Sequence, residues 1–380
     1  MNGFSLSVGR PGAPLHAAAH SHHPWPDVTR VAQEQAWDDA ARLLDRKWEH
    51  VFAAVVPAAQ AHIARELRLP DPKSIAFGPN THSFLLRILS CLPRTRPVRV
   101  LTTSSEFLSF ARQIARFEED GAAVVTRISC EPFGTFEARV CEAAQKGGYD
   151  LIYVSQVFFD SGFAIGDLPA IVNSVLTADT VVAIDGYHGF MAVPTDLGAV
   201  AERAFYLAGG YKYAMAGEGV CFLHCPPGVC PRPRDTGWYA GFSALESGGK
   251  GVPFASDGSR FFGATFDVSG LYRFNAVQDW LVREGRAVAS MLEEVRALER
   301  RFLAELDRLQ APIGTGDLLV AEESRRGRFL AFRTRGAAQI TARLAAANVI
   351  VDHRADRLRI GFGIYHAADD ALRLARAIAG

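Results

Sequence analysis

The feature of this 380-residue sequence that most restricts its fold is a series of short apolar runs that alternate with helical stretches. The runs are rich in β-branched residues and lie at 74–77, 98–103, 122–129, 150–155, 180–185, 203–209 and 219–224. Near-continuous apolar strands separated by helices are typical of a parallel sheet covered on both faces. We therefore predict an α/β fold whose large domain is built on a mainly parallel sheet.

The sequence on either side of this region predicts two further parts. Residues 31–68 carry apolar side chains at helical spacing, which predicts one long or two shorter helices. A loop-rich passage at 237–267 precedes an expected long amphipathic helix at about 268–309 and then a second α/β pattern. We expect three parts: an N-terminal segment and helices at 1–72 that pack with the small domain, the large domain at 73–267, and a small C-terminal α/β domain at 268–380.

The composition argues against several classes of protein. Lys and Arg together number 41, as do Asp and Glu, so the formal charge is zero and neither nucleic acid nor an anionic membrane is indicated as a partner. The longest apolar runs, such as 51–59, are far shorter than the roughly 20 residues that a spanning helix needs. No cationic stretch with a long apolar run marks a secretory signal. With only six cysteines, we expect a cytoplasmic protein with reduced thiols.

One group of metal-ligating residues lies close together in the chain: Cys221, His224, Cys225 and Cys230. Their spacing is not that of two C-x2-C pairs, which zinc sites commonly use. Cys221 also falls in an apolar run that predicts a strand, so its side chain is expected in the core. We therefore predict no metal site.

Asp185 ends the strongly apolar run 180–185 and is the first candidate for chemistry. A buried carboxylate is costly unless it is paired, so a cationic partner is expected, and the pyridinium nitrogen of a coenzyme would serve. His188 could stack near such a ring or hydrogen-bond Asp185. The alternative is that Asp185 caps a helix, and both interpretations stay open at this point.

Lys212 is the second candidate, in a glycine-rich loop between two apolar runs. Tyr211 and Tyr213 flank it, so its amine is expected to be only partly solvated. Desolvation lowers the pKa of a lysine and makes the neutral amine available for a Schiff base. A solvated loop lysine is the alternative. The order strand–Asp followed by strand–Lys favours the first interpretation.

A third candidate site begins the helical stretch after the run 74–77. Asn80, Thr81, His82 and Ser83 stand where free backbone N–H groups and the helix dipole favour a phosphate. The same residues would also serve as ordinary helix caps.

In this order, the motifs resemble the class V aminotransferase family of fold-type I enzymes, which depend on pyridoxal 5′-phosphate (PLP), and kynureninase-like members are the most similar. The resemblance covers roughly residues 14–375. It is carried by N-T-x-S at 80–83, S-E-F at 105–107, S-Q-V-x-x-x-S-G at 155–162, D-x-x-H at 185–188, Y-K-Y at 211–213 with Gly217-x-Gly219, and L-R-I-G-F at 358–362.

The resemblance implies roles for individual residues. Lys212 would be the Schiff-base lysine and would move the Cα proton, while Asp185 would pair with the pyridine nitrogen, with His188 beside it. The rest of the cofactor would be held by Thr81, His82, Ser83 and Tyr211 at the phosphate and by Phe107 stacked on the ring. A core position is the alternative for Phe107, since most Phe are buried.

Arg359 matches the arginine that clamps the substrate's α-carboxylate in the family, and a planar guanidinium suits a carboxylate well. Arg357 lies two residues away on the same strand face, so the choice between the two stays open. Trp238 and Thr265 resemble positions that reach the cofactor phosphate of the neighbouring subunit. They imply a C2 homodimer with a shared active site, although a buried structural Trp is the alternative for Trp238.

The sequence also departs from the family pattern. Phe159 stands where many members have an Asn that contacts the cofactor's 3′-oxygen, and Gln156 could serve that oxygen instead. Glu218 replaces the Pro of the G-P-G stretch. His20 and Ser21 replace a G-N-S-L-G stretch of kynureninases and are candidates for substrate binding, and a solvated loop position is the alternative for His20. These differences leave the substrate open.

We therefore predict a PLP-dependent enzyme of kynureninase-like class V type that removes the Cα proton of an amino acid. Transamination, Cβ–Cγ cleavage and β-elimination share the same electron sink, so the residues do not separate them. The alternatives are a kynureninase or other β-lyase or hydrolase proper, and a catalytically silent PLP-binding protein. An NAD(P)-binding protein would need a G-x-G-x-x-G after the first strand, which is absent.

Overall fold

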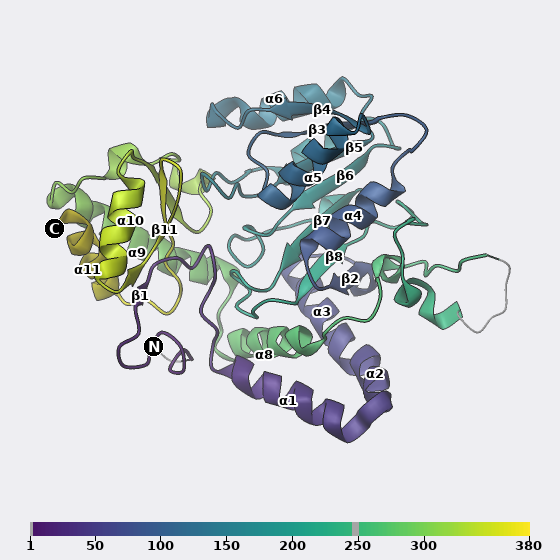
Figure 1. The fold of residues 1–380 in the computed structure, drawn as a ribbon, viewed down its shortest axis with the longest axis horizontal. Helices are drawn as coiled ribbons and strands as arrows, with labels where there is room; N and C mark the ends of the chain where they lie inside the picture. Colours follow the sequence, from purple (N-terminus) through teal and green to yellow (C-terminus); the bar gives the residue numbers. More distant parts are fainter. Residues whose placement is uncertain (1–2, 245–250) are drawn as a thin grey trace.

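A computed structural model describes residues 3–244 and 251–380. Its centre is a seven-stranded sheet with the strand order β2-β8-β7-β6-β5-β3-β4, seen in Figure 1. The strands are β2 (Ile75–Gly78), β3 (Val98–Thr103), β4 (Ala123–Ile128), β5 (Leu151–Ser155), β6 (Val181–Asp185), β7 (Ala204–Gly209) and β8 (Cys221–His224). All seven predicted runs form strands.

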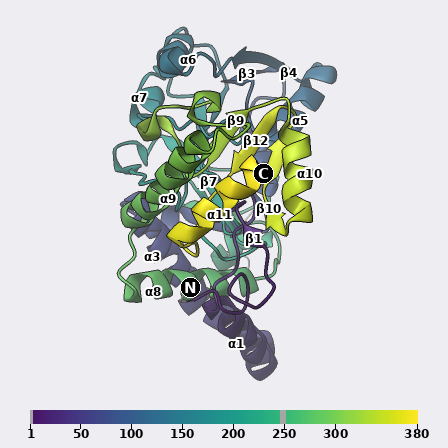
Figure 2. The same cartoon turned by 90° about the vertical axis from the view of Figure 1, so that its left-hand side faces the viewer.

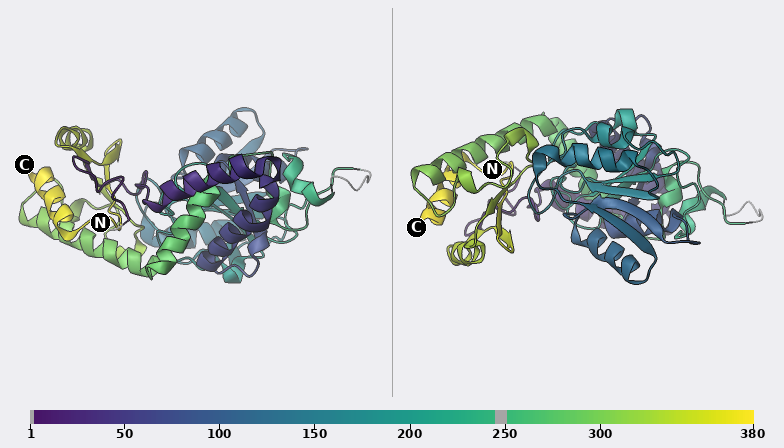
Figure 3. Two further views of the ribbon diagram at one scale, coloured as in Figure 1. Left: turned by 90° about the horizontal axis from the view of Figure 1, so that it is seen from below. Right: turned by 90° about the horizontal axis from the view of Figure 1, so that it is seen from above.

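The central sheet is mainly parallel, as predicted. Strands β3 to β7 run parallel to their neighbours, whereas β8 is antiparallel to both β7 and β2. All residues of β5, β6 and β7 are buried, because helices cover both faces of the sheet (Figure 3). These helices include α4 (Thr81–Cys91), α5 (Leu108–Glu119), α6 (Phe136–Gln145) and α7 (Leu168–Asn173).

The N-terminal helices contact both the large domain and the first helix of the C-terminal part at 268–380. Helix α1 (Val28–Leu43) continues through α2 (Lys47–His50) and a π-helical turn at 51–55 into α3 (Val56–Leu67). Helix α1 lies along α8 (Ser269–Arg283), and α3 contributes side chains to the core of the large sheet. The segment before these helices pairs with the small domain through β1 (Leu15–His16).

The predicted long helix at 268–309 is two helices. Helix α8 ends at Arg283 and α9 (Val288–Arg308) begins five residues later. Gly285 between them has φ +65°, a left-handed conformation that ends helices and that glycine adopts without strain. The break lets α8 pack on the large domain while α9 packs on the small one.

The small domain has a hydrophobic core of its own, to which α9 contributes Val295, Phe302 and Leu306. Figure 2 shows α9 and α11 beside its sheet. The remaining elements are β9 (Leu330–Arg333), α10 (Ala337–Ala346), β10 (Val349–Ile350), β11 (Asp352–Arg354), β12 (Arg357–Ile360) and α11 (Ala368–Ala379). Strands β11, β12 and β9 form one antiparallel sheet, and β1 pairs with β10. Before β9, Leu318 makes a single bridge to Phe332.

Two further features bear on the protein's class. Within the part of the chain that the structure describes, no helix combines the length and the apolar character that crossing a membrane requires. In the same residues, no group of three or more His, Cys, Asp or Glu side chains is placed to hold a metal ion. Cys221 is buried in β8, and the ring of His224 is hydrogen-bonded to Ser74 and to the carbonyl of Ala201.

Candidate active site

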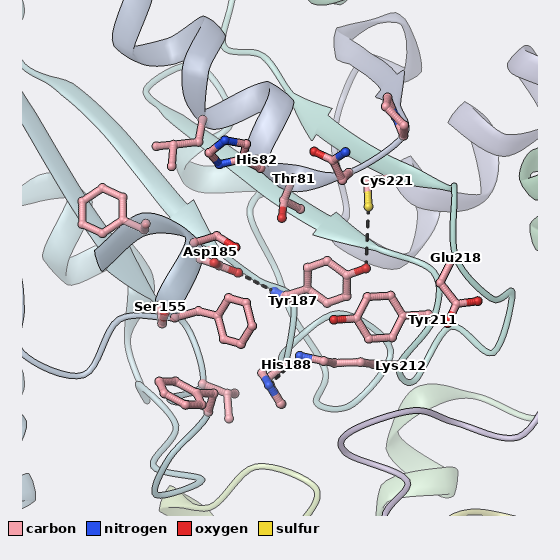
Figure 4. Close-up of a pocket in the computed structure, with 18 of the residues that line it drawn as sticks. Thr81, His82, Ser155, Asp185, Tyr187, His188, Tyr211, Lys212, Glu218 and Cys221 are labelled. Atoms are coloured by element: carbon pink, nitrogen blue, oxygen red, sulfur yellow. Dashed lines mark hydrogen bonds between the residues drawn. The ribbon is translucent and has the colours of Figure 1, made fainter. Parts of the chain in front are cut away.

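A cavity of about 280 Å³ lies at the carboxyl ends of the parallel strands, where ligands of open α/β sheets bind. The loops after β2, β3, β5, β6 and β7 all contribute to its wall. Figure 4 shows Thr81, Asp185, Tyr187 and Lys212 converging on it. Its volume is near the lower limit of pockets that hold one small ligand.

Lys212 is the buried amine of this cavity. Its side chain is 5% exposed, and its Nζ lies 2.6 Å from Nε2 of His188. The rings of Tyr187, Phe107 and Tyr211 surround the amine, with centroids 4.7, 5.4 and 5.5 Å from Nζ. Burial lowers the pKa of Lys212 to about 7, with the Arg359 charge acting in the same direction and Asp185 against it. Near neutral pH, a substantial fraction of this amine is therefore uncharged.

Glycines at the end of β7 make room for this arrangement. A Cβ on Gly209 would lie 2.3 Å from the Tyr187 hydroxyl oxygen, and one on Gly210 would lie 2.3 Å from a methyl carbon of Val220. Gly217 and Gly219 have φ of +75° and +84°, which other residues rarely adopt. The chain can therefore turn from β7 into β8 with the lysine held at the bend.

Asp185 lies at the end of β6 and is 8% exposed. Its carboxylate accepts hydrogen bonds from the Tyr153 hydroxyl at 3.0 Å and from the Tyr187 N–H at 2.9 Å. Burial raises the pKa of Asp185 above its ordinary value, although both hydrogen bonds and Lys212 oppose this. Among the described residues no cationic group lies within ion-pair distance of it. The carboxylate is thus suited to a cation that enters the cavity.

His188 lines the cavity beside the lysine. Burial and the charge of Lys212 hold the pKa of His188 well below its usual value, so the ring is neutral. When the lysine amine is protonated it donates this hydrogen bond to Nε2, and the proton of the neutral ring is then on Nδ1. This Nδ1 is buried and has no hydrogen-bond partner in the described part of the chain.

The N-terminus of α4 forms another wall of the cavity. Asn80 is its N-cap and accepts a hydrogen bond from the Ser83 N–H at 2.9 Å. Asn80, Thr81 and His82 line the cavity, whereas Ser83 does not, and the Ser83 hydroxyl donates to Asn80 at 3.1 Å. The first turn of an 11-residue helix thus faces a space in which an anionic group would be stabilised.

A second buried carboxyl group, Glu106, supports the wall of the cavity and escaped the sequence analysis. It accepts hydrogen bonds from Thr103 Oγ1 at 2.7 Å and from Ser155 Oγ at 2.5 Å. Burial raises the pKa of Glu106 to about 8, and the nearby Asp185 acts in the same direction. Ser155 lines the cavity, so Glu106 acts on it through this hydroxyl.

The two aromatic candidates lie together. Phe107 precedes α5, lines the cavity, and meets Phe159 edge-to-face at 5.4 Å. Gln156 does not line the cavity. Its amide donates to Thr195 and accepts from the Tyr206 hydroxyl, at 2.8 and 2.7 Å. It points to the other side of the chain from Ser155 because adjacent residues of an extended chain face opposite ways.

Two of the candidates for substrate binding, Arg359 and His20, meet at one carboxylate and do not line the cavity. Arg359 is 3% exposed and forms a two-point ion pair with Asp352, a residue the sequence analysis had not singled out. His20 binds the same carboxylate, with its Nε2 3.1 Å from Asp352 Oδ1. Ser21 lies outside this cluster and contacts His22. Arg357 is paired with Asp160 instead.

Trp238 and Thr265 lie together but away from the cavity of their own chain. The indole N–H of Trp238 donates to the Thr265 hydroxyl at 3.2 Å, and the Trp238 side chain is 43% exposed. Trp238 is therefore not a buried structural residue, which removes that alternative.

Tyr187 lines the cavity but was not among the residues predicted from the sequence. It lies between Asp185 and His188, contacts Lys212, and its hydroxyl is 3.6 Å from Sγ of Cys221. Its position inside the D-x-x-H motif was the available signal.

Comparisons with known proteins find no matching family model and no curated protein of similar sequence. Solved structures do match over almost the whole chain. A cysteine desulfurase from Thermococcus onnurineus NA1 has a TM-score of 0.79 at 14% identity and covers 99% of this chain and 96% of that chain. The complex of the cystine C-S lyase C-DES with cysteine persulfide has a TM-score of 0.82 at 15% identity, covering 98% and 99%. The cysteine desulfurase CsdA from Escherichia coli has a TM-score of 0.76 at 16% identity, covering 99% and 96%. These similarities confirm the predicted fold.

Proposed function

We propose that the protein is an enzyme that binds PLP covalently through Lys212 and acts on an amino-acid substrate. The observation that carries this proposal is a buried amine with a pKa of about 7, placed in one cavity with the unpaired carboxylate of Asp185. C-DES, whose fold this chain shares, has a PLP cofactor.

The residues of the cavity fit such a coenzyme. The first turn of α4, with Thr81 and His82, would hold the phosphate. Asp185 would face a protonated ring nitrogen, which supplies the cation that this buried carboxylate lacks. Phe107 would cover the ring, and the hydroxyl of Tyr211 would reach the phosphate. When bound, PLP supplies an electron sink for negative charge at the substrate's Cα.

The protein's own groups would handle the proton. Lys212 in its neutral form can accept the proton from the substrate's Cα and return it. His188 holds the amine in place through the hydrogen bond at 2.6 Å. The aromatic rings of Tyr187, Phe107 and Tyr211 exclude water from the amine, which keeps its pKa near neutral.

Within this function, we propose class V chemistry of kynureninase-like type, which the Y-K-Y loop around Lys212 supports. A C–S or other β-lyase is the second candidate, because two of the solved structures with this fold are cysteine desulfurases and another is a cystine C-S lyase. Product analysis separates them. Kynureninase chemistry yields alanine and an aryl acid from kynurenine, transamination yields a keto acid, and C–S cleavage of cystine yields a persulfide.

We also propose that the protein is a cytoplasmic homodimer. The six cysteines, all within the described residues, are unpaired, which suits a reducing compartment. The exposed Trp238 supports a contact with a second copy of the chain.

The covalent attachment can be tested by trapping. Wild-type protein incubated with PLP should gain a visible absorbance band, and borohydride should fix the coenzyme on the peptide that contains Lys212. Lys212→Ala should show neither the band nor the adduct. Lys146→Ala is the control, because Lys146 is a solvent-exposed lysine paired with Glu142. Equal trapping in Lys212→Ala and wild type, or no uptake by wild type, would refute the proposal.

A further inference from the structure

The guanidinium group of Arg359 already holds a carboxylate that belongs to the protein. Its Nε donates to Asp352 Oδ1 at 2.8 Å and its Nη2 donates to Asp352 Oδ2 at 2.5 Å. The two residues face each other across β11 and β12, where Asp352 and Arg359 are register partners. This is the parallel two-point geometry with which an arginine binds any carboxylate.

His20 closes this pair from the other side. Its ring is fully buried, stacks on Phe329 at 4.7 Å, and places Nε2 3.1 Å from Asp352 Oδ1. A Cβ on Gly361 would lie 2.5 Å from Nδ1 of His20, so the ring has little space to move. Both oxygens of Asp352 are therefore engaged. Burial works against its ionisation, but the His20 hydrogen bond and the Arg359 charge hold the pKa of Asp352 below its usual value.

The pair lies directly behind the cavity wall. Nη1 of Arg359 donates to the carbonyl of Phe159 at 2.5 Å, and Phe159 lines the cavity. The charge of Arg359 also acts on Lys212 and on His188. Arg359 is thus close enough to serve a substrate in the cavity. Its guanidinium group, however, is already bound to the carboxylate of Asp352.

We propose that Asp352 is a specificity-determining residue that competes with the carboxylate of a substrate for Arg359. A ligand with a free α-carboxylate must displace Asp352, whereas a ligand without one has no such competitor. The competition lowers the preference of the site for free amino acids over their amides. This inference rests on the proposed function, because it assigns the ligand class of the same site.

The test compares an acid with its amide. Spectral titration of the PLP-loaded protein with L-alanine and with L-alaninamide gives a ratio of the two affinities. Asp352→Asn removes the competing charge but keeps a side chain of the same shape. The ratio should shift toward L-alanine by about tenfold or more, since hydrogen bonds between charged groups are of that strength. An unchanged ratio in a folded Asp352→Asn protein overturns the proposal.

The chain offers a matched control in Asp160, the partner of Arg357. The side chains of Asp160 and Asp352 are 18% and 24% exposed, and each pairs with an arginine of β12. Asp160→Asn should leave the acid-to-amide ratio as in wild type. If Asp160→Asn shifts the ratio and Asp352→Asn does not, Arg357 is the clamp and the proposal fails. Asp352→Ser serves as a second neutral variant should Asp352→Asn not fold.

A second measurement separates this proposal from the proposed function. Calorimetry with acetate and with acetamide, without added coenzyme, should show acetate binding that is stronger in Asp352→Asn than in wild type. If this selective gain occurs while no variant takes up PLP, the proposed function fails and the competition stands. If PLP binds and neither acetate nor L-alanine gains affinity in Asp352→Asn, the competition fails and the proposed function stands.

Discussion

Burial of the Lys212 amine lowers the stability of the folded protein. This effect on the free energy of unfolding can be measured without any ligand. The pKa of Lys212 falls from the ordinary 10.5 to about 7 because burial disfavours the charged amine. Between these two pH values the unfolded chain binds more protons than the folded one, so stability rises as the pH rises from 7 toward 10.5. The cost is therefore largest at and below pH 7.

Replacing the amine should remove this cost. We expect Lys212→Met to raise the free energy of unfolding by about 1–3 kcal/mol at pH 6–7, with the gain shrinking as the pH approaches 10.5. Denaturant unfolding of the coenzyme-free protein at several pH values measures this difference. Lys146→Met, at an exposed site, should show no such trend. A gain that does not depend on pH would mean that the amine of Lys212 is solvated.

The sequence could identify single candidate residues from their positions at strand ends. It could not identify which side chains pair with one another. Asp185 and Lys212 follow apolar strands, and strand ends are readable from the sequence. The pairing of Arg359 with Asp352 depends on the register of two short strands, which no local pattern specifies. The position of Gln156 depends on which way the chain faces after β5 ends, and the family resemblance did not determine that.

The first turn of helix α4 should affect both the stability of the protein and the binding of a ligand. Its N-cap Asn80 satisfies the Ser83 N–H, and the same residue lines the cavity. Asn80→Ala should lower the free energy of unfolding by about 1 kcal/mol, since it removes the cap. Asn80→Asp should keep the cap and the stability, because Asp caps as well as Asn does.

The two variants should differ from each other both in stability and in coenzyme affinity. Asn80→Asp places a negative charge where we propose that the phosphate binds, so its affinity for PLP should fall several-fold despite normal stability. Unfolding curves and PLP titrations of the same preparations give both numbers. If Asn80→Asp binds PLP as well as wild type does, the phosphate does not lie at this helix.

Elements with a strong apolar pattern were predicted from the sequence. A helix boundary that depends on the backbone conformation of one residue was not. All seven strands of the central sheet were readable from their apolar, β-branched runs, and β5, β6 and β7 are buried at every residue. The break between α8 and α9 depends on Gly285, and a glycine inside an amphipathic pattern is tolerated often enough to be overlooked.

At the scale of the whole molecule, the exposed position of Trp238 indicates a contact with a second chain. Trp238 stacks on Tyr239 at 4.1 Å and contacts Phe242, yet both Trp238 and Phe242 remain largely exposed. Exposed aromatic clusters often mark contacts between proteins. We propose that a second copy covers this cluster and that Trp238 and Thr265 contribute to the phosphate end of that copy's cavity.

A mixture of two defective variants tests whether the site is shared. Lys212→Ala lacks the covalent anchor, and Trp238→Ala would lack the contact to the neighbouring phosphate. A hybrid dimer would contain one site with both residues intact, so co-expression should restore borohydride trapping at limiting PLP to roughly a quarter of the wild-type amount, because half of the dimers are hybrids with one good site of two. Trapping no greater than the average of the two separate variants would mean that each chain completes its own site. The protein should also sediment with the mass of two 41.3 kDa chains. A monomer that traps PLP fully would contradict the shared site.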